Sequence, residues 1–193
     1  LGDGTSSVLT ALLSGCYGSD IAIESGGATA LIPCMSALYR VNLSTGAATV
    51  VSSSISGVGI DIESSGNTAL VSSASGMALR RVVLADGTVT VVADGLFPDS
   101  SLRAECTAVA IEAGGLTALV TQTGIDAAPA ESGRVVRVNL ATGAVTILVP
   151  IGLMGDQNYS CGVVGIAIEE GGASALVADM GDGLVRVNLA TPQ

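Results

Sequence analysis

The sequence predicts an all-β fold, a four-bladed β-propeller with four antiparallel strands in each blade. Three observations support this prediction: small and β-branched side chains dominate, short strand patterns alternate with Gly-containing turns, and one segment recurs four times. The chain has 193 residues, including 26 Gly, one Phe, no His and no Lys. Its core must therefore be built from aliphatic side chains.

The repeated unit reads as four short strands. The first strand has the pattern Ile/Val-x-Ile-Glu and begins at Ile21, Ile60, Val109 and Ile166. A Gly-containing turn leads to a second strand at residues 29–32, 68–71, 117–120 and 174–177. The third strand is marked by Arg40, Arg81, Arg137 and Arg186, and a tight turn leads to a fourth strand at residues 48–51, 88–92 and 145–149. This order is typical of a propeller blade.

The fourth strand of the last unit is expected at the beginning of the chain. Residues 1–4 resemble residues 84–87, so residues 7–13 read as a fourth strand. We expect a single domain, residues 1–193, with blade 1 at about 21–51, blade 2 at about 60–92, blade 3 at about 109–149, and blade 4 at about 166–193 closed by 1–13. Pairing of two chains into an eight-bladed ring, or donation of residues 7–13 to a neighbouring chain, are the alternatives to closure within one chain.

The segments GIAIE (165–169), ALVAD (175–179) and GLVRVNLAT (183–191) resemble the NHL/SMP-30-type propeller repeat. The resemblance covers the whole chain, four times over. It implies the propeller fold but not one activity, because this superfamily includes lactonases, lyases and interaction modules. The chain departs from the pattern in having four blades rather than six, and in lacking the His residues used by the lyase and several hydrolase branches.

Charge and composition exclude several classes of function. The net charge of −10 disfavours binding to nucleic acid or to anionic membrane surfaces, and no apolar run is long enough for a spanning helix. Without His there is no Ser-His-Asp or Cys-His machinery, and without Lys there is no Schiff base. Carboxylate and metal chemistry is what remains for an enzyme.

Four cysteines, Cys16, Cys34, Cys106 and Cys161, occur without CxxC spacing. We expect two disulfides, Cys16–Cys34 and Cys106–Cys161, although four cysteines allow three pairings. Disulfides imply an oxidising compartment, so the expected location is extracellular or secreted, with the cell surface and periplasm as alternatives. Asn158 begins an Asn-x-Ser triplet and is a candidate glycosylation site.

Two groups of acidic residues are candidate binding sites. The repeated Glu24, Glu63, Glu112 and Glu169 could form a cation site, but a structural role is favoured because the Arg residues recur as regularly. In that role each Glu caps the turn after the first strand or pairs with a repeated Arg. Asp61 replaces an Ala of the other repeats, and Asp179 and Asp182 have a calcium-type acid/Gly spacing. Asp61, Asp179 and Asp182 are therefore the candidate metal ligands and Ca²⁺ the candidate cofactor, with a solvated acid and an ordinary repeat turn as the alternatives.

Long loops at residues 95–106, 121–133 and 152–161 are expected on one face, which would then meet a ligand or another subunit. These observations together predict a secreted, non-enzymatic module for binding or self-assembly. Its expected partner is a protein, including further copies of itself, as in an extracellular filament, sheath or surface layer. A metal-dependent lactonase or hydrolase of the SMP-30-like kind is the alternative.

Overall fold

The computed structural model describes residues 7–10, 16, 20–73, 77–96, 104–124, 133–150, 163–179 and 182–190, and of residues 104–107 and 123–124 it describes the backbone alone. Everything below concerns these residues. They contain strands and turns and no helix, which confirms the all-β prediction. The described residues therefore include no helix long and apolar enough to cross a membrane.

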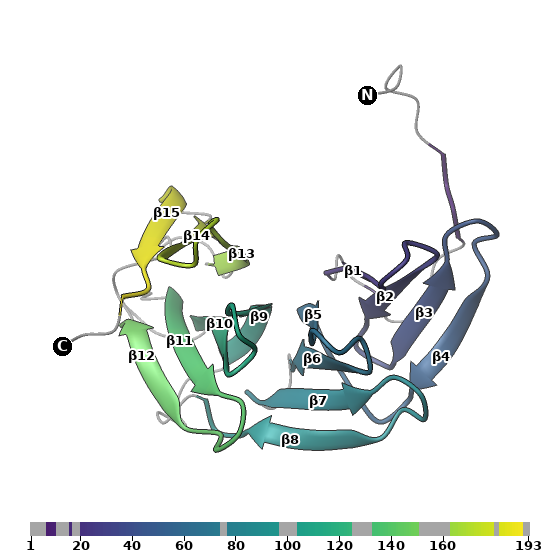
Figure 1. Ribbon diagram of the computed structural model, residues 1–193, viewed down its shortest axis with the longest axis horizontal. Helices are drawn as coiled ribbons and strands as arrows, with labels where there is room; N and C mark the ends of the chain where they lie inside the picture. Colours follow the sequence, from purple (N-terminus) through teal and green to yellow (C-terminus); the bar gives the residue numbers. More distant parts are fainter. Residues whose placement is uncertain are drawn as a thin grey trace.

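The described strands form four antiparallel sheets, one for each repeat, in chain order (Figure 1). Blade 1 contains β1 (Ala22–Ile23), β2 (Thr29–Pro33), β3 (Leu38–Asn42) and β4 (Ala48–Ser52). Blade 2 contains β5 (Ile60–Ile62), β6 (Thr68–Ser72), β7 (Leu79–Val83) and β8 (Val89–Ala93). Blade 3 contains β9 (Ala104–Ile111), β10 (Thr117–Gly124), β11 (Gly133–Asn139) and β12 (Val145–Val149), and blade 4 contains β13 (Val163–Ile168), β14 (Ser174–Asp179) and β15 (Gly183–Asn188).

The core lies between blades rather than inside any one of them. Leu31 and Leu38 of blade 1 pack with Ile60, Val71 and Val82 of blade 2 in one buried cluster. Equivalent clusters join blade 2 to blade 3 and blade 3 to blade 4. The middle strands are buried on both faces, which explains why they read as short continuous apolar runs such as Ala69-Leu70-Val71. Each blade therefore depends on its neighbours for its stability.

The four blades form the predicted four-bladed β-propeller arrangement. Their inner strands, β1, β5, β9 and β13, contact one another in chain order. The blades follow an arc with blade 1 and blade 4 at its two ends (Figure 1). Among the described strands, blade 1 therefore has one face toward blade 2 and another that no blade covers, and the same holds for blade 4 on the side away from blade 3.

The described residues do not show the expected closure of blade 4 by residues 7–13 of the same chain. The described sheet of blade 4 has three strands, β13–β14–β15. Leu9 and Thr10 instead lie against Gly46, in the turn between β3 and β4 of blade 1. The physical reason is the short connection from this segment into blade 1, where the Cys16–Cys34 disulfide ties it to the end of β2. Residues 11–13 lie outside the described residues.

Candidate functional site

Each blade contains one Glu–Arg pair that joins the end of its first strand to its third strand, half-buried in blades 1–3 and more exposed in blade 4. The Arg Nε donates to the Glu Oε2 at 2.7 Å in Arg40–Glu24, 2.7 Å in Arg81–Glu63, 2.6 Å in Arg137–Glu112 and 2.7 Å in Arg186–Glu169. The Nη2 atom of each Arg donates to the second carboxylate oxygen, so every pair is bidentate. The predicted structural pairing of the four Glu residues is therefore confirmed.

A hydroxyl group completes three of these pairs. Thr29 Oγ1 donates to Glu24 at 2.7 Å, Thr68 Oγ1 to Glu63 at 2.5 Å and Ser174 Oγ to Glu169 at 2.6 Å. The hydrogen bond from Arg40 lowers the pKa of Glu24 against the opposing effect of burial, with Thr29 contributing. These carboxylates are ionised and occupied by donors from their own blade, which leaves them little capacity to coordinate a cation.

Three of the four Arg side chains also bind the next blade along the chain. Arg40 Nη2 donates to the carbonyl of Leu84 at 3.3 Å, Arg81 Nη2 to that of Leu140 at 3.5 Å, and Arg137 Nη2 to that of Leu189 at 2.8 Å. We call this contact the Arg clip. The exposed fractions of the three side chains are 31%, 29% and 15%, whereas Arg186 of blade 4, which meets no further blade among the described residues, is 65% exposed.

The outer face of blade 4 is uncovered at apolar positions as well. Leu184 on β15 is 68% exposed, whereas the equivalent Leu38, Leu79 and Val135 are completely buried by the following blade. Leu176 on β14 is half-buried, whereas its equivalents in blades 1–3 have no exposed surface. We call the surface formed by Leu176, Leu184 and Arg186 the end face of blade 4. It combines exposed apolar surface, a cation and the free edge of β15.

Blade 1 has a corresponding uncovered face at the other end of the arc. Ile21 is 56% exposed, whereas the equivalent Ile60 and Val109 are 3% and 5% exposed. Ile32 and Leu43 are half-buried where their equivalents in the other blades are buried. We call the surface formed by Ile21, Ile32 and Leu43 the front face of blade 1. It corresponds to the faces by which blades 2, 3 and 4 receive the preceding blade.

Asp61 joins blade 2 to blade 3. Its Oδ2 accepts a hydrogen bond from the backbone N–H of Ile111 at 2.8 Å, and its Oδ1 accepts one from the N–H of Ile62 at 2.8 Å. Burial raises the pKa of Asp61, although both N–H donors oppose the change. A shallow pocket of about 400 Å³ lies beside it, lined also by Ser64 and Glu112. Both oxygens of the carboxylate therefore already accept a backbone N–H, Oδ2 across the junction with blade 3 and Oδ1 within blade 2.

Asp179 ends β14 and Asp182 directly precedes β15, and the N–H of Asp182 donates to Asp179 Oδ1 at 3.0 Å. Within the described ranges, no three His, Cys, Asp or Glu side chains are grouped closely enough to hold a metal ion. The structure therefore does not bring these two residues and Asp61 together as one described cluster. The role of Asp61, Asp179 and Asp182 as Ca²⁺ ligands stays a prediction.

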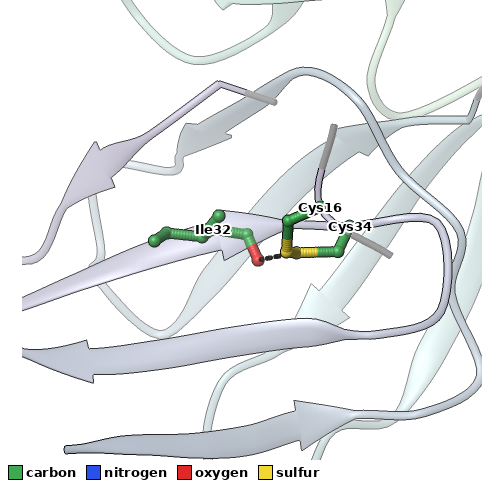
Figure 2. The surroundings of a disulfide bond; sticks show 3 residues. All are labelled: Cys16, Ile32 and Cys34. Atoms are coloured by element: carbon green, nitrogen blue, oxygen red, sulfur yellow. Dashed lines mark hydrogen bonds between the residues drawn. A yellow bond between two sulfur atoms is a disulfide. The ribbon is translucent and has the colours of Figure 1, made fainter. Parts of the chain in front are cut away.

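Cys16 and Cys34 lie at disulfide distance, with their Cα atoms 4.5 Å apart (Figure 2). The buried Cys34 follows β2, and its sulfur lies 3.8 Å from the carbonyl oxygen of Ile32 (Figure 2). A cross-link across 18 residues stabilises a domain by about 3 kcal/mol in the chain-entropy description. Cys161 and Asn158 lie outside the described residues, and of Cys106 the backbone alone is described, so the second disulfide and the glycosylation site stay predictions.

Sequence reasoning missed a second Arg contact between blades. Arg134 at the beginning of β11 is buried and donates to Gln122 on β10 and to the carbonyl of Leu96, which follows blade 2. Gln122 has no exposed surface. Neither residue recurs in the other blades, so the repeat carried no signal for them. The only available signal was the polar run Thr121-Gln122-Thr123 in a strand that is otherwise apolar.

The long loops predicted to form one decorated face lie mostly outside the described residues.

The ionised Glu24 should make the free energy of unfolding depend on pH in the acidic range. The folded-state pKa of Glu24 lies below its ordinary value of 4.5, so its contribution is complete above that value and is lost as the pH falls through the folded-state pKa. We expect Glu24→Gln to lower the free energy of unfolding by about 1 kcal/mol near neutral pH. The difference from wild type should shrink as the pH falls through the folded-state pKa, as measured by urea unfolding at neutral and at acidic pH. The exposed Glu170→Gln is the control, and an equal deficit at both pH values would contradict the assignment.

No protein-family model matches the chain, and no curated protein sequence matches it. Solved structures do match it, and they share its β-propeller fold. A chain of the nidogen/laminin complex has a TM-score of 0.65 and 12% identity over 88% of this chain and 59% of its own length. The calcium-binding protein regucalcin from Agrobacterium tumefaciens has a TM-score of 0.64 and 19% identity over 90% and 54%.

The β-propeller domain of Cps50 (Swd1) from Myceliophteria thermophila has a TM-score of 0.57 and 13% identity over 90% of this chain and 51% of its own length. The chain thus spans between 51% and 59% of the length of these three solved structures. At these identities the similarity establishes the β-propeller fold alone.

Proposed function

We propose that this β-propeller is a secreted, non-enzymatic protein-binding module that receives an extended polypeptide along β15 at the end face of blade 4. The observation that carries the proposal is Leu184, which is 68% exposed where its equivalents in blades 1–3 are buried. An open strand edge beside exposed apolar side chains is the combination used in β-strand addition. Backbone groups of the edge supply affinity, and the neighbouring side chains supply specificity.

Two further observations support a binding role in an extracellular setting. The Cys16–Cys34 disulfide is typical of proteins from oxidising compartments. One of the similar propellers was solved in a complex between two proteins, nidogen and laminin. The affiliation with the NHL/SMP-30 type belongs to this proposal too, supported by the repeat segments and by the likeness to regucalcin.

The alternative, a metal-dependent hydrolase, is less well supported by the described side chains. It needs carboxylates that converge on a metal ion. The carboxylate of Asp61 instead accepts two backbone N–H groups, and the four repeated Glu residues are paired with Arg. We therefore favour the binding function.

A synthetic peptide tests this function directly. The probe is residues 143–150, the turn and strand that pair with β11 in blade 3. We expect saturating peptide to slow amide hydrogen exchange of β15 about tenfold or more, because strand addition protects the edge amides. Leu184→Asp should abolish the effect. Val164→Asp, at a 53% exposed position on β13, is the matched control and should leave it intact.

A scrambled peptide of the same composition separates strand addition from non-specific adhesion. Unchanged exchange at β15 with the native peptide would refute the proposed function. Equal protection by the scrambled peptide would refute it too, because the edge would then lack specificity.

A further inference from the structure

We propose that the natural occupant of the β15 edge is a second copy of this chain, which supplies residues 7–10 as the missing fourth strand of blade 4. This inference rests on the proposed function and names its partner. It predicts a head-to-tail assembly in which the end face of blade 4 of one copy packs on the front face of blade 1 of the next.

The position of Leu9 is the first step. At each junction inside the chain, the fourth strand of one blade lies against the turn glycine of the next. A Cβ added at Gly87 would overlap the carbonyl oxygen of Val51, and one added at Gly143 would overlap that of Val92. A Cβ added at Gly46 would overlap the carbonyl oxygen of Leu9 in the same way. Leu9 therefore lies where the fourth strand of a blade preceding blade 1 belongs.

The side chains of this segment agree with that position. Ser7-Val8-Leu9-Thr10 corresponds to Thr49-Val50-Val51-Ser52 of β4 and to Thr90-Val91-Val92-Ala93 of β8. In both strands the Thr lies opposite the clip Arg, as the pairs Arg40–Thr49 and Arg81–Thr90 show. Transferring this register places Ser7 opposite Arg186, Val8 opposite Val185 and Thr10 opposite Leu184. A small hydroxyl residue then faces Arg186, as it does in the other blades.

The exposure of Val8 agrees with an unpaired strand. Val50 and Val91, which occupy the same position within β4 and β8, are 56% and 58% exposed. Val8 is 91% exposed. Leu9 is 44% exposed, whereas the equivalent Val51 and Val92 are half-buried. In blades 1 and 2 the neighbouring third strand covers part of the surface of these side chains. In the proposed assembly, β15 of another copy would cover the same part of Val8 and Leu9.

The Arg clip supplies a specific polar contact for the same interface. In each internal junction the Arg of one blade donates to the carbonyl of the Leu that follows the third strand of the next. By this rule Arg186 of one copy donates to the carbonyl of Leu43 in the other. Around the clip, Leu176 and Leu184 would pack on Ile21 and Ile32, as Leu31 and Leu38 pack on Ile60 and Val71 between blades 1 and 2.

One chain cannot make this contact with itself in the arrangement described. The contact of Leu9 with Gly46 and the Cys16–Cys34 disulfide hold the segment to blade 1. Blade 1 and β15 lie at opposite ends of the arc (Figure 1). The strand and the edge that it fits must therefore come from different copies.

Cysteine cross-linking between two variants tests the register and the direction of assembly. Val8→Cys and Val185→Cys are prepared as separate full-length proteins and mixed under mild oxidation, with the native cysteines in place. We expect a covalent dimer on a non-reducing gel, at least about fivefold above either variant alone, because paired cross-strand positions lie within disulfide reach. Val8→Cys mixed with Val164→Cys is the matched control and should remain at background.

Sedimentation of the unmodified chain gives a second readout. We expect the average mass to rise with concentration in multiples of the monomer. Arg186→Ala should weaken the association about tenfold, the size expected for one charge-assisted hydrogen bond. Glu170→Gln, an exposed change on the same blade, should leave it unchanged.

The outcomes separate this inference from the proposed function. A strictly monomeric chain with no excess cross-link overturns the second-copy proposal, while protection of β15 by the β12-derived peptide would still support the binding module. Slow exchange at β15 in the monomer without peptide would mean that another segment of the same chain covers the edge, and this also overturns the inference. Failure of both the cross-link and the peptide experiment removes both proposals.

Discussion

Replacing Arg137 with Ala is expected to lower the free energy of unfolding by about 3 kcal/mol. Arg137 and Glu112 are 15% and 13% exposed, the lowest values among the four pairs. The change removes a bidentate ion pair and the clip to the Leu189 carbonyl, and it leaves the Glu112 carboxylate largely desolvated without its partner. A buried charge that loses its partner is far more costly than an exposed one. Urea unfolding at neutral pH measures the effect.

Arg186→Ala is the matched control for this prediction. The same pair in blade 4 has an Arg that is 65% exposed and makes no clip within the chain. In the dilute monomer its loss should cost far less than the loss of Arg137, because water replaces the lost interaction. Equal costs for Arg137→Ala and Arg186→Ala would contradict the view that the clip and burial, rather than the pair alone, stabilise the junctions.

Replacing Gly87 with Ala is expected to lower the free energy of unfolding by about 3 kcal/mol or more. Gly87 has a φ of +73°, and a Cβ at this position would overlap the carbonyl oxygen of Val51 in the preceding blade. The variant therefore bears two costs, the left-handed backbone of an L-residue and the separation of two packed blades. Thermal and urea unfolding measure the sum of these costs.

Gly115→Ala separates the two costs. Gly115 has a similar φ of +68°, but nothing lies within 4 Å of an added Cβ. Its replacement should cost only about 1 kcal/mol, the backbone contribution alone. The difference between the two variants then measures how closely blade 1 approaches the turn of blade 2. Similar losses for both would mean that the junction yields easily and that the close approach contributes little.

The repeat carried most of the correct predictions. The Ile/Val-x-Ile-Glu and Arg patterns placed the strands of all four blades and paired Glu24 with Arg40 and its equivalents. They succeeded because each repeat must satisfy the same local packing and the same ion pair. The Cys16–Cys34 pair was predictable for a related reason, since Cys16 precedes blade 1 and Cys34 follows the second strand of the same blade.

Residues that act between blades were harder to predict. Arg134 and Gln122 occur once, so no repetition drew attention to them. Asp61 was noticed as an exception to the repeat, but its hydrogen bond to Ile111, 50 residues away, could not be read from the pattern. Partners at such separations depend on how the sheets are placed in space.

The segment at residues 7–10 shows what the local sequence determines and what only the tertiary structure decides. Its Ser-Val-Leu-Thr pattern resembles that of a fourth strand, because alternation and turn spacing are local properties of the chain. The pattern could not indicate which sheet edge this segment meets, because the fourth strands of the blades have similar sequence patterns. The arc and the contact of Leu9 with Gly46 place it beside blade 1 and away from β15. The local sequence thus specified the strands of each blade. The packing of the blades in space decided that the edge of β15 and the segment at residues 7–10 do not meet in the structure described.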